Sequence, residues 1–167
     1  MTGLPCSGKS TIAYGIAAAL HWPVFSVDPV DSAMRRDGVD PDTAGQAAYS
    51  VCRSLAAEQL KIGLSVVIDA VNAHQDAREI WLELARQLAT RLTLVECVCP
   101  DEELHRARVL SRIRNLPHYP ELTWAIVEET KARYTPWEID KLRLSTDEAS
   151  ASLIDRALDY IRGREET

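Results

Sequence analysis

The sequence predicts an α/β fold in which a parallel β-sheet is covered by helices on both faces. Three observations support this class. Apolar runs of strand length alternate with segments of helical periodicity along most of the 167 residues. A glycine-rich loop stands directly before the first helical segment. Two apolar runs end in an aspartate, Asp28 and Asp69, where ligands bind in open α/β sheets.

The first part of the chain predicts a helix, a strand and a loop. Lys9–Leu20 is rich in Ala, Ile and Leu, and Pro23 stops this helix. Val24–Val27 is an apolar run that predicts a short strand ending at Asp28. Residues 29–42 contain two prolines and a glycine, so a loop is expected there.

A helix and a strand are expected next. Thr43–Lys61 has helical periodicity, and Gly63 lies just beyond its end. Its inward face is expected to hold Ala47, Val51, Leu55 and Leu60. Ser65–Ile68 is a continuous apolar run that predicts a buried strand ending in Asp69.

The second half of the chain continues the same alternation. Asp76–Arg91 is amphipathic and predicts a helix, and Leu92–Val98 predicts the next strand. A further helix is expected to begin after Pro100, with Asp101 as its N-cap. The remaining expected elements are a helix at Glu121–Tyr134, a strand at Leu142–Leu144 and a closing helix at Ala149–Arg162.

The segment Gly3–Ser10 fits the pattern G-x-x-x-x-G-K-[ST], the phosphate-binding loop or Walker A motif. Its glycines let the backbone approach phosphate oxygens, and the following helix directs its positive dipole end toward them. Lys9 is expected to reach the β- and γ-phosphates, and Ser10 to bind Mg²⁺. The residues predicted to bind the nucleotide are Gly3, Pro5, Cys6, Ser7, Gly8, Lys9, Ser10 and Thr11. The alternative is a Gly/Ser turn that caps a helix.

The strand that normally precedes such a loop is missing, because only Met1 and Thr2 stand before Gly3. In this fold the strand lies inside the sheet, so its two neighbours would carry unpaired backbone groups. Three explanations stay open. The numbered start lies inside a longer reading frame, the chain has been shortened, or the protein is degenerate.

The aspartates at the two strand ends are predicted to have two different roles. One holds Mg²⁺ through water, and the other orients or deprotonates an acceptor hydroxyl. The alternative for Asp28 and Asp69 is helix capping or turn formation.

Arginines crowd the helix expected after Asp101. Arg108 and Arg112 are four residues apart and are expected to share a face, where guanidinium groups would clamp a transferring phosphoryl group. A break at 115–120 follows, which predicts a lid around residues 106–122. A solvated helix face is the alternative. Arg35 and Arg36 are weaker candidates for meeting an anionic acceptor.

Composition predicts a single soluble domain over residues 1–167. The net charge of -6 discourages non-specific nucleic-acid binding. No apolar run approaches the length of a membrane span, and no signal peptide is recognisable. The four cysteines do not have the spacing of a zinc site, which suits small buried thiols in a reducing cytoplasm.

With these segments in view, the chain resembles the small P-loop kinases of the AAA_33 type. This group is related to the kinase domain of polynucleotide kinase, chloramphenicol phosphotransferase, gluconate kinase and the zeta toxins. The resemblance covers nearly the whole chain. It is carried by residues 3–11 (GLPCSGKST), 26–28 (SVD), 66–72 (VVIDAVN) and 106–112 (RARVLSR).

The resemblance implies a nucleoside-kinase-like strand order, ATP and Mg²⁺ as cofactors, and roles for individual residues. Asp28 matches the acid that activates the acceptor hydroxyl, and Asp69 the acid near Mg²⁺ and substrate. Arg108 and Arg112 match the lid arginines. Asp31 departs from the group, which often has an arginine there.

The leading functional hypothesis is an ATP-dependent kinase that phosphorylates a hydroxyl group of a small molecule, with Lys9, Asp28, Arg108 and Arg112 as catalytic residues. A nucleic-acid 5′-end kinase is the first alternative, and the overall acidity and Asp31 count against it. An ATP-binding module without phosphotransfer is the second alternative. The sequence does not define the acceptor.

Overall fold

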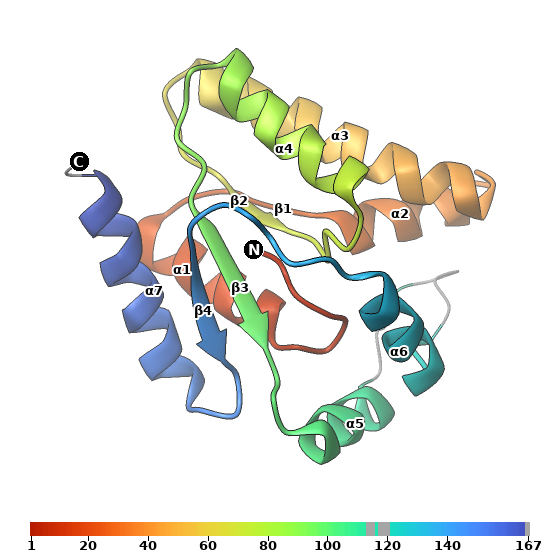
Figure 1. Ribbon diagram of the computed structural model, residues 1–167. Coiled ribbons are helices and arrows are strands. Elements are labelled where there is room, and N and C mark those ends of the chain that lie inside the picture. Colours follow the sequence, from red (N-terminus) through yellow and green to blue (C-terminus); the bar gives the residue numbers. More distant parts are fainter. Residues whose placement is uncertain (113–115, 117–120, 166–167) are drawn as a thin grey trace.

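A computed structural model describes residues 1–112, 116 and 121–165 of the chain. Helices and strands alternate as the sequence predicts (Figure 1). The elements are α1 (Lys9–Leu20), β1 (Val24–Ser26), α2 (Val27–Arg36), α3 (Pro41–Lys61), β2 (Val67–Asp69), α4 (Gln75–Gln87), β3 (Leu94–Val98), α5 (Glu102–Ser111), α6 (Trp124–Arg133), β4 (Lys141–Ser145) and α7 (Ser150–Glu165). None of the described helices is both long and apolar enough to cross a lipid bilayer.

The strands form two parallel pairs, β1 with β2 and β3 with β4. The first residues of the chain lie between these pairs (Figure 1). The Met1 amine donates to Ile68 O at 2.7 Å. Thr2 N donates to Val95 O at 2.9 Å, and Thr2 O accepts from Cys97 N at 2.9 Å. Met1 and Thr2 therefore occupy the end of the central strand position whose absence the sequence indicated, and they connect the two halves of the sheet.

Helices cover both faces of the sheet, as predicted. Ile12 and Ile16 of α1 and Leu153 of α7 form one apolar core with Val95 and Leu144 of the strands. A second core lies on the opposite face, where α3 and α4 pack (Figure 1). Its buried members are Val27, Ala48, Cys52, Ala56, Ala57, Ala70, Trp81 and Leu84. This three-layer arrangement places the carboxyl ends of all the strands at one edge, beside the loop before α1.

The prediction of a loop at residues 29–42 is wrong, because α2 occupies Val27–Arg36. Pro29 stands in the first turn of this helix, where its missing N–H has no intrahelical partner to lose. Asp28 is therefore a helix residue, and the strand before it ends at Ser26 rather than Val27. The helix α4 also ends earlier than predicted, at Gln87.

The buried face of α3 is shifted by one residue from the predicted Ala47, Val51 and Leu55, whereas Leu60 packs against the core as predicted. The buried side chains are Ala44, Ala48, Cys52, Ala56 and Ala57, whereas Leu55 is 46% exposed. The prediction chose the larger apolar residues. Because α3 packs against α2 and α4 together, small side chains occupy the contact face instead.

Candidate functional site

The loop before α1 winds through left-handed backbone conformations at three positions. The φ angles are 142° at Gly3, 60° at Cys6 and 84° at Gly8. A Cβ atom on Gly3 would lie 2.3 Å from Cys97 O and 2.7 Å from Ser7 Oγ, so only glycine fits there. When left-handed and right-handed backbone conformations alternate in a short loop, successive N–H groups point toward one concavity. Such a concavity suits an anion such as phosphate.

The helices α5 and α6 support this loop from outside. His105 Nε2 lies 2.8 Å from Pro5 O, and the imidazole is buried. Cys6 packs with Val109 of α5 and Val127 of α6 in a small apolar core. Sequence reasoning missed His105, since a single histidine inside a helix carries no pattern that separates it from a surface residue.

A cavity of about 330 Å³ lies beside the loop and the start of α1. Its walls are Cys6, Gly8, Lys9, Ser10, Thr11, Ile12, Arg108, Ser111, Arg112, Thr146, Ser150 and Leu153. The cavity brings together Lys9, Ser10, Arg108 and Arg112, which the sequence singled out although about a hundred residues separate them. Lys9 is only 4% exposed, so its charge is held in the site rather than in bulk water.

The two arginines that line this cavity contact different groups. Arg108 of α5 donates to Thr146 Oγ1 at 3.0 Å and to Thr146 O at 2.5 Å. Arg112 directs a guanidinium nitrogen to Cys6 Sγ at 3.6 Å. Thr146, in the turn after β4, was not anticipated; it lines the cavity, and its side chain would also contact a Cβ atom on Gly8 at 3.3 Å.

Arg108 and Arg112 share a face as expected, because Arg112 N still donates to Arg108 O at 3.1 Å and both residues line the cavity. The helix α5 ends at Ser111, and Arg112 follows it with an extended backbone, φ -77° and ψ 119°. Arg106 lies over the Trp124 ring, 4.8 Å from its centroid, and is not among the cavity walls. Much of the predicted lid, including Arg114, falls outside the described residues, so the lid stays a prediction.

The two aspartates lie at the carboxyl end of the β1–β2 pair and do not line this cavity. Ser26 is the register partner of Asp69, and its hydroxyl donates to Asp69 Oδ2 at 3.2 Å. Asp69 is 4% exposed. Asp28 follows β1 by two residues, in the first turn of α2, so both carboxyl groups belong to the same edge of the sheet.

The donor set near the loop fits Mg²⁺. Asp69 Oδ1 is buried and has no hydrogen-bond partner among the described residues. Ser10 supplies a hydroxyl at the start of α1. Mg²⁺ prefers oxygen ligands, and proteins usually bind it through one or two side chains together with substrate phosphates. That Ser10 and Asp69 hold the ion together stays a prediction, because Asp69 does not line the cavity that contains Ser10.

The arginines that follow Asp28 already have acidic partners. Arg35 Nε donates to Asp31 Oδ1 at 2.6 Å, in a pair whose aspartate side chain is 6% exposed. Arg36 pairs with the neighbouring Asp37 at 2.9 Å on the surface. These carboxylates neutralise the guanidinium charges that would have to stay unpaired for Arg35 and Arg36 to bind an anion.

Comparisons with known proteins find a matching family model and solved structures of similar fold. The family model AAA_33, described as an AAA domain, matches residues 1–137. A putative kinase from Chloroflexus aurantiacus superposes with a TM-score of 0.76 at 21% identity, covering 97% of this chain and 93% of that one. The Mycobacterium tuberculosis APS kinase, solved with AMPPNP and APS, gives 0.70 at 17% identity over 96% and 94%. A gluconokinase from Sinorhizobium meliloti gives 0.66 at 17% identity over 99% and 91%. At these identities the likeness shows a shared fold.

Proposed function

Because the chain belongs to the AAA_33 family of AAA domains, we propose that it is an ATP-dependent kinase that transfers the γ-phosphate of ATP to a hydroxyl group of a small molecule. The observation that carries this proposal is the cavity beside the loop, where Lys9, Ser10, Arg108 and Arg112 converge. Cations held around a triphosphate are what phosphoryl transfer requires, since its transition state gathers charge on the transferred oxygens.

In the proposed reaction the acceptor oxygen attacks the γ-phosphorus, and the bond from that phosphorus to the β–γ bridging oxygen breaks to release ADP. Main-chain N–H groups of Gly3–Ser10 bind the phosphates, and Lys9 and Arg112 balance their charge. Mg²⁺, when bound through Ser10 and Asp69, supplies further charge neutralisation. Asp28 accepts the proton of the acceptor hydroxyl.

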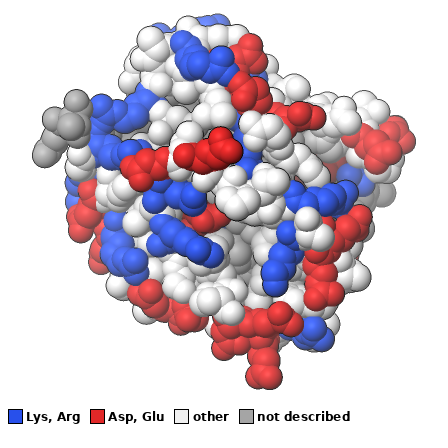
Figure 2. Space-filling model, viewed as in Figure 1, with Lys and Arg blue, Asp and Glu red and all other residues white. Residues whose placement is uncertain are grey.

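Small-molecule acceptors are supported by the kinds of proteins that share the fold. The similar structures include a sugar kinase, a gluconokinase and an APS kinase, whose acceptors are small. A nucleic-acid 5′-end kinase would need a basic track for the phosphate backbone. On the face drawn in Figure 2, described Lys and Arg side chains are interspersed with Asp and Glu rather than gathered into such a track.

The direct test incubates the protein with ATP, Mg²⁺ and a panel of hydroxyl-bearing metabolites and detects phosphorylated products by mass spectrometry. Lys9→Ala is expected to abolish transfer. Asp28→Asn is expected to lower kcat by about 10²–10⁴-fold, the usual contribution of a general base. Asp37→Asn, an exposed carboxylate at the other end of α2, is the matched control and should leave kcat unchanged.

Two results would contradict the proposal. Unchanged turnover in Lys9→Ala would show that the loop does not act on the triphosphate. ATP binding by calorimetry without transfer to any acceptor, including oligonucleotide 5′ ends, would instead indicate a nucleotide-binding module.

A further inference from the structure

A buried histidine holds the carbonyl group of Pro5 on the outer side of the loop before α1. His105 of α5 is only 4% exposed, and its Nε2 lies 2.8 Å from Pro5 O. A carbonyl oxygen can only accept, so Nε2 carries the hydrogen and donates it. Because a buried carbonyl without a partner is unfavourable, this bond fixes the direction in which the Pro5 carbonyl points.

The direction of this carbonyl also determines where the next N–H group points. Pro5 O and the Cys6 N–H belong to the same peptide unit, which is planar and trans. In a trans unit the C=O and the N–H point in opposite directions. His105 holds the carbonyl from outside the loop, so the Cys6 N–H points toward the inside. There it has no acceptor among the described residues.

The backbone of Cys6 needs support from its neighbours. Its φ of 60° lies in the left-handed region, which residues with a Cβ atom seldom adopt. The Cys6 side chain packs with Val109 of α5 and Val127 of α6. These apolar contacts hold the side chain, and the bond from His105 holds the preceding peptide unit. Together they maintain an unfavourable conformation that lets the loop present this N–H group.

We propose that His105 is a positioning residue for the loop, which keeps the Cys6 N–H directed at the triphosphate of ATP. The proposal rests on the proposed binding of ATP by this loop. His105 is not a wall of the cavity that Lys9 and Ser10 line, so it acts through the Pro5–Cys6 peptide unit and not on the nucleotide. The same helix brings Arg108 to that cavity, so α5 positions a guanidinium group and a main-chain donor together.

Two substitutions of His105 separate the hydrogen bond from the packing. His105→Gln keeps an N–H donor near the place of Nε2, whereas His105→Leu fills a similar volume without a donor. Val109→Ala is the matched control, because Val109 is 2% exposed, lies on the same helix and belongs to the same apolar core. This variant should lose stability while the bond to Pro5 O stays intact. Urea denaturation checks that every variant folds.

Calorimetry with AMPPNP and Mg²⁺ measures nucleotide binding without turnover. His105→Leu is expected to raise the Kd for AMPPNP about tenfold, because the loop loses one orienting bond and leaves a buried carbonyl without a partner. His105→Gln should stay within about threefold of the unaltered chain, because it restores the donor. Val109→Ala should stay within about twofold, because its loss is one of packing alone.

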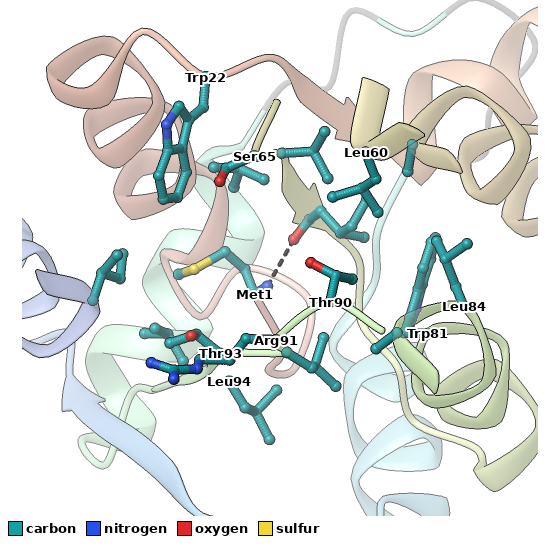
Figure 3. A pocket seen from close by; sticks show the side chains of 18 of the residues that line it. Met1, Trp22, Leu60, Ser65, Trp81, Leu84, Thr90, Arg91, Thr93 and Leu94 are labelled. Atoms are coloured by element: carbon teal, nitrogen blue, oxygen red, sulfur yellow. Dashed lines mark hydrogen bonds between the residues drawn. The ribbon is translucent and has the colours of Figure 1, made fainter. Parts of the chain in front are cut away.

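The amide resonance of Cys6 gives a second measurement, which a merely structural role of His105 would not change. Saturating AMPPNP should shift this resonance strongly in the unaltered chain and in His105→Gln, and only weakly in His105→Leu. A cavity of about 390 Å³ also lies between β2 and β3, but neither His105 nor the loop lines it (Figure 3). A nucleotide bound there would leave the Cys6 amide unchanged.

The outcomes separate this role from the proposed kinase activity. Equal AMPPNP affinity of His105→Leu and the unaltered chain would overturn the role of His105, and so would an equal loss in Val109→Ala. The expected effects on AMPPNP binding, without phosphate transfer to any acceptor, would refute the kinase and support the role of His105. Absence of AMPPNP binding by the unaltered chain would refute ATP binding by the loop and this role with it.

Discussion

Replacing Gly3 with alanine is expected to destabilise the protein far more than the same change at an open glycine. Gly3 has φ 142°, and a Cβ there would lie 2.3 Å from Cys97 O. That carbonyl belongs to β3, which Thr2 and β4 hold on both sides, so it cannot move away cheaply. Backbone strain of about 1–2 kcal/mol and overpacking of about 1–3 kcal/mol together predict a loss of about 2–5 kcal/mol.

Gly63→Ala is the matched control, because Gly63 has φ 83° and nothing within 4 Å of an added Cβ. It should lose only the strain of about 1–2 kcal/mol. Urea denaturation of the two variants measures the difference, and Tm should fall by about 2–4 °C for each kcal/mol. Gly3→Ala should also weaken ATP binding, whereas Gly63→Ala should not. Equal stabilities of the two variants would refute the steric argument.

Three further predictions concern the site and the chain's buried groups. Arg108→Lys is expected to raise the KM for ATP about tenfold, because lysine lacks the planar fork that donates two bonds to the turn after β4. Arg106→Lys, on the same helix and outside the cavity, should change KM less than about twofold; steady-state kinetics compare the two. Burial lowers the pKa of the Met1 amine, so the unfolded chain binds the proton more tightly. The free energy of unfolding should therefore gain a component that rises with pH until about pH 8, and N-terminal acetylation should remove it from urea titrations across pH. Burial also raises the pKa of Cys97 to about 11. Iodoacetamide at pH 8 should accordingly alkylate the partly exposed Cys99 and spare Cys97 in peptide mapping, and equal labelling would contradict the burial of Cys97.

Local signals predicted much of the secondary structure correctly. The helix Lys9–Leu20 has the predicted bounds, and Asp101 caps α5 by accepting from Leu104 N at 3.0 Å. Both features depend on neighbouring residues alone, which sequence reasoning can weigh. The loop expected from Pro29 was wrong, because proline is tolerated in a first helical turn and burial of Val27 favours that turn.

The sequence alone determined that a glycine-rich loop precedes α1 and that Asp69 ends a strand, because these features are short-range patterns of residue type. Only the tertiary structure decided which distant groups meet the loop. His105 contacts the loop at Pro5, and Thr146 lines the same cavity as the loop. Both follow from packing of α5 and the turn after β4, which no local pattern encodes. The arrangement of Met1 between β2 and β3 likewise comes from long-range strand pairing, which a linear sequence does not specify.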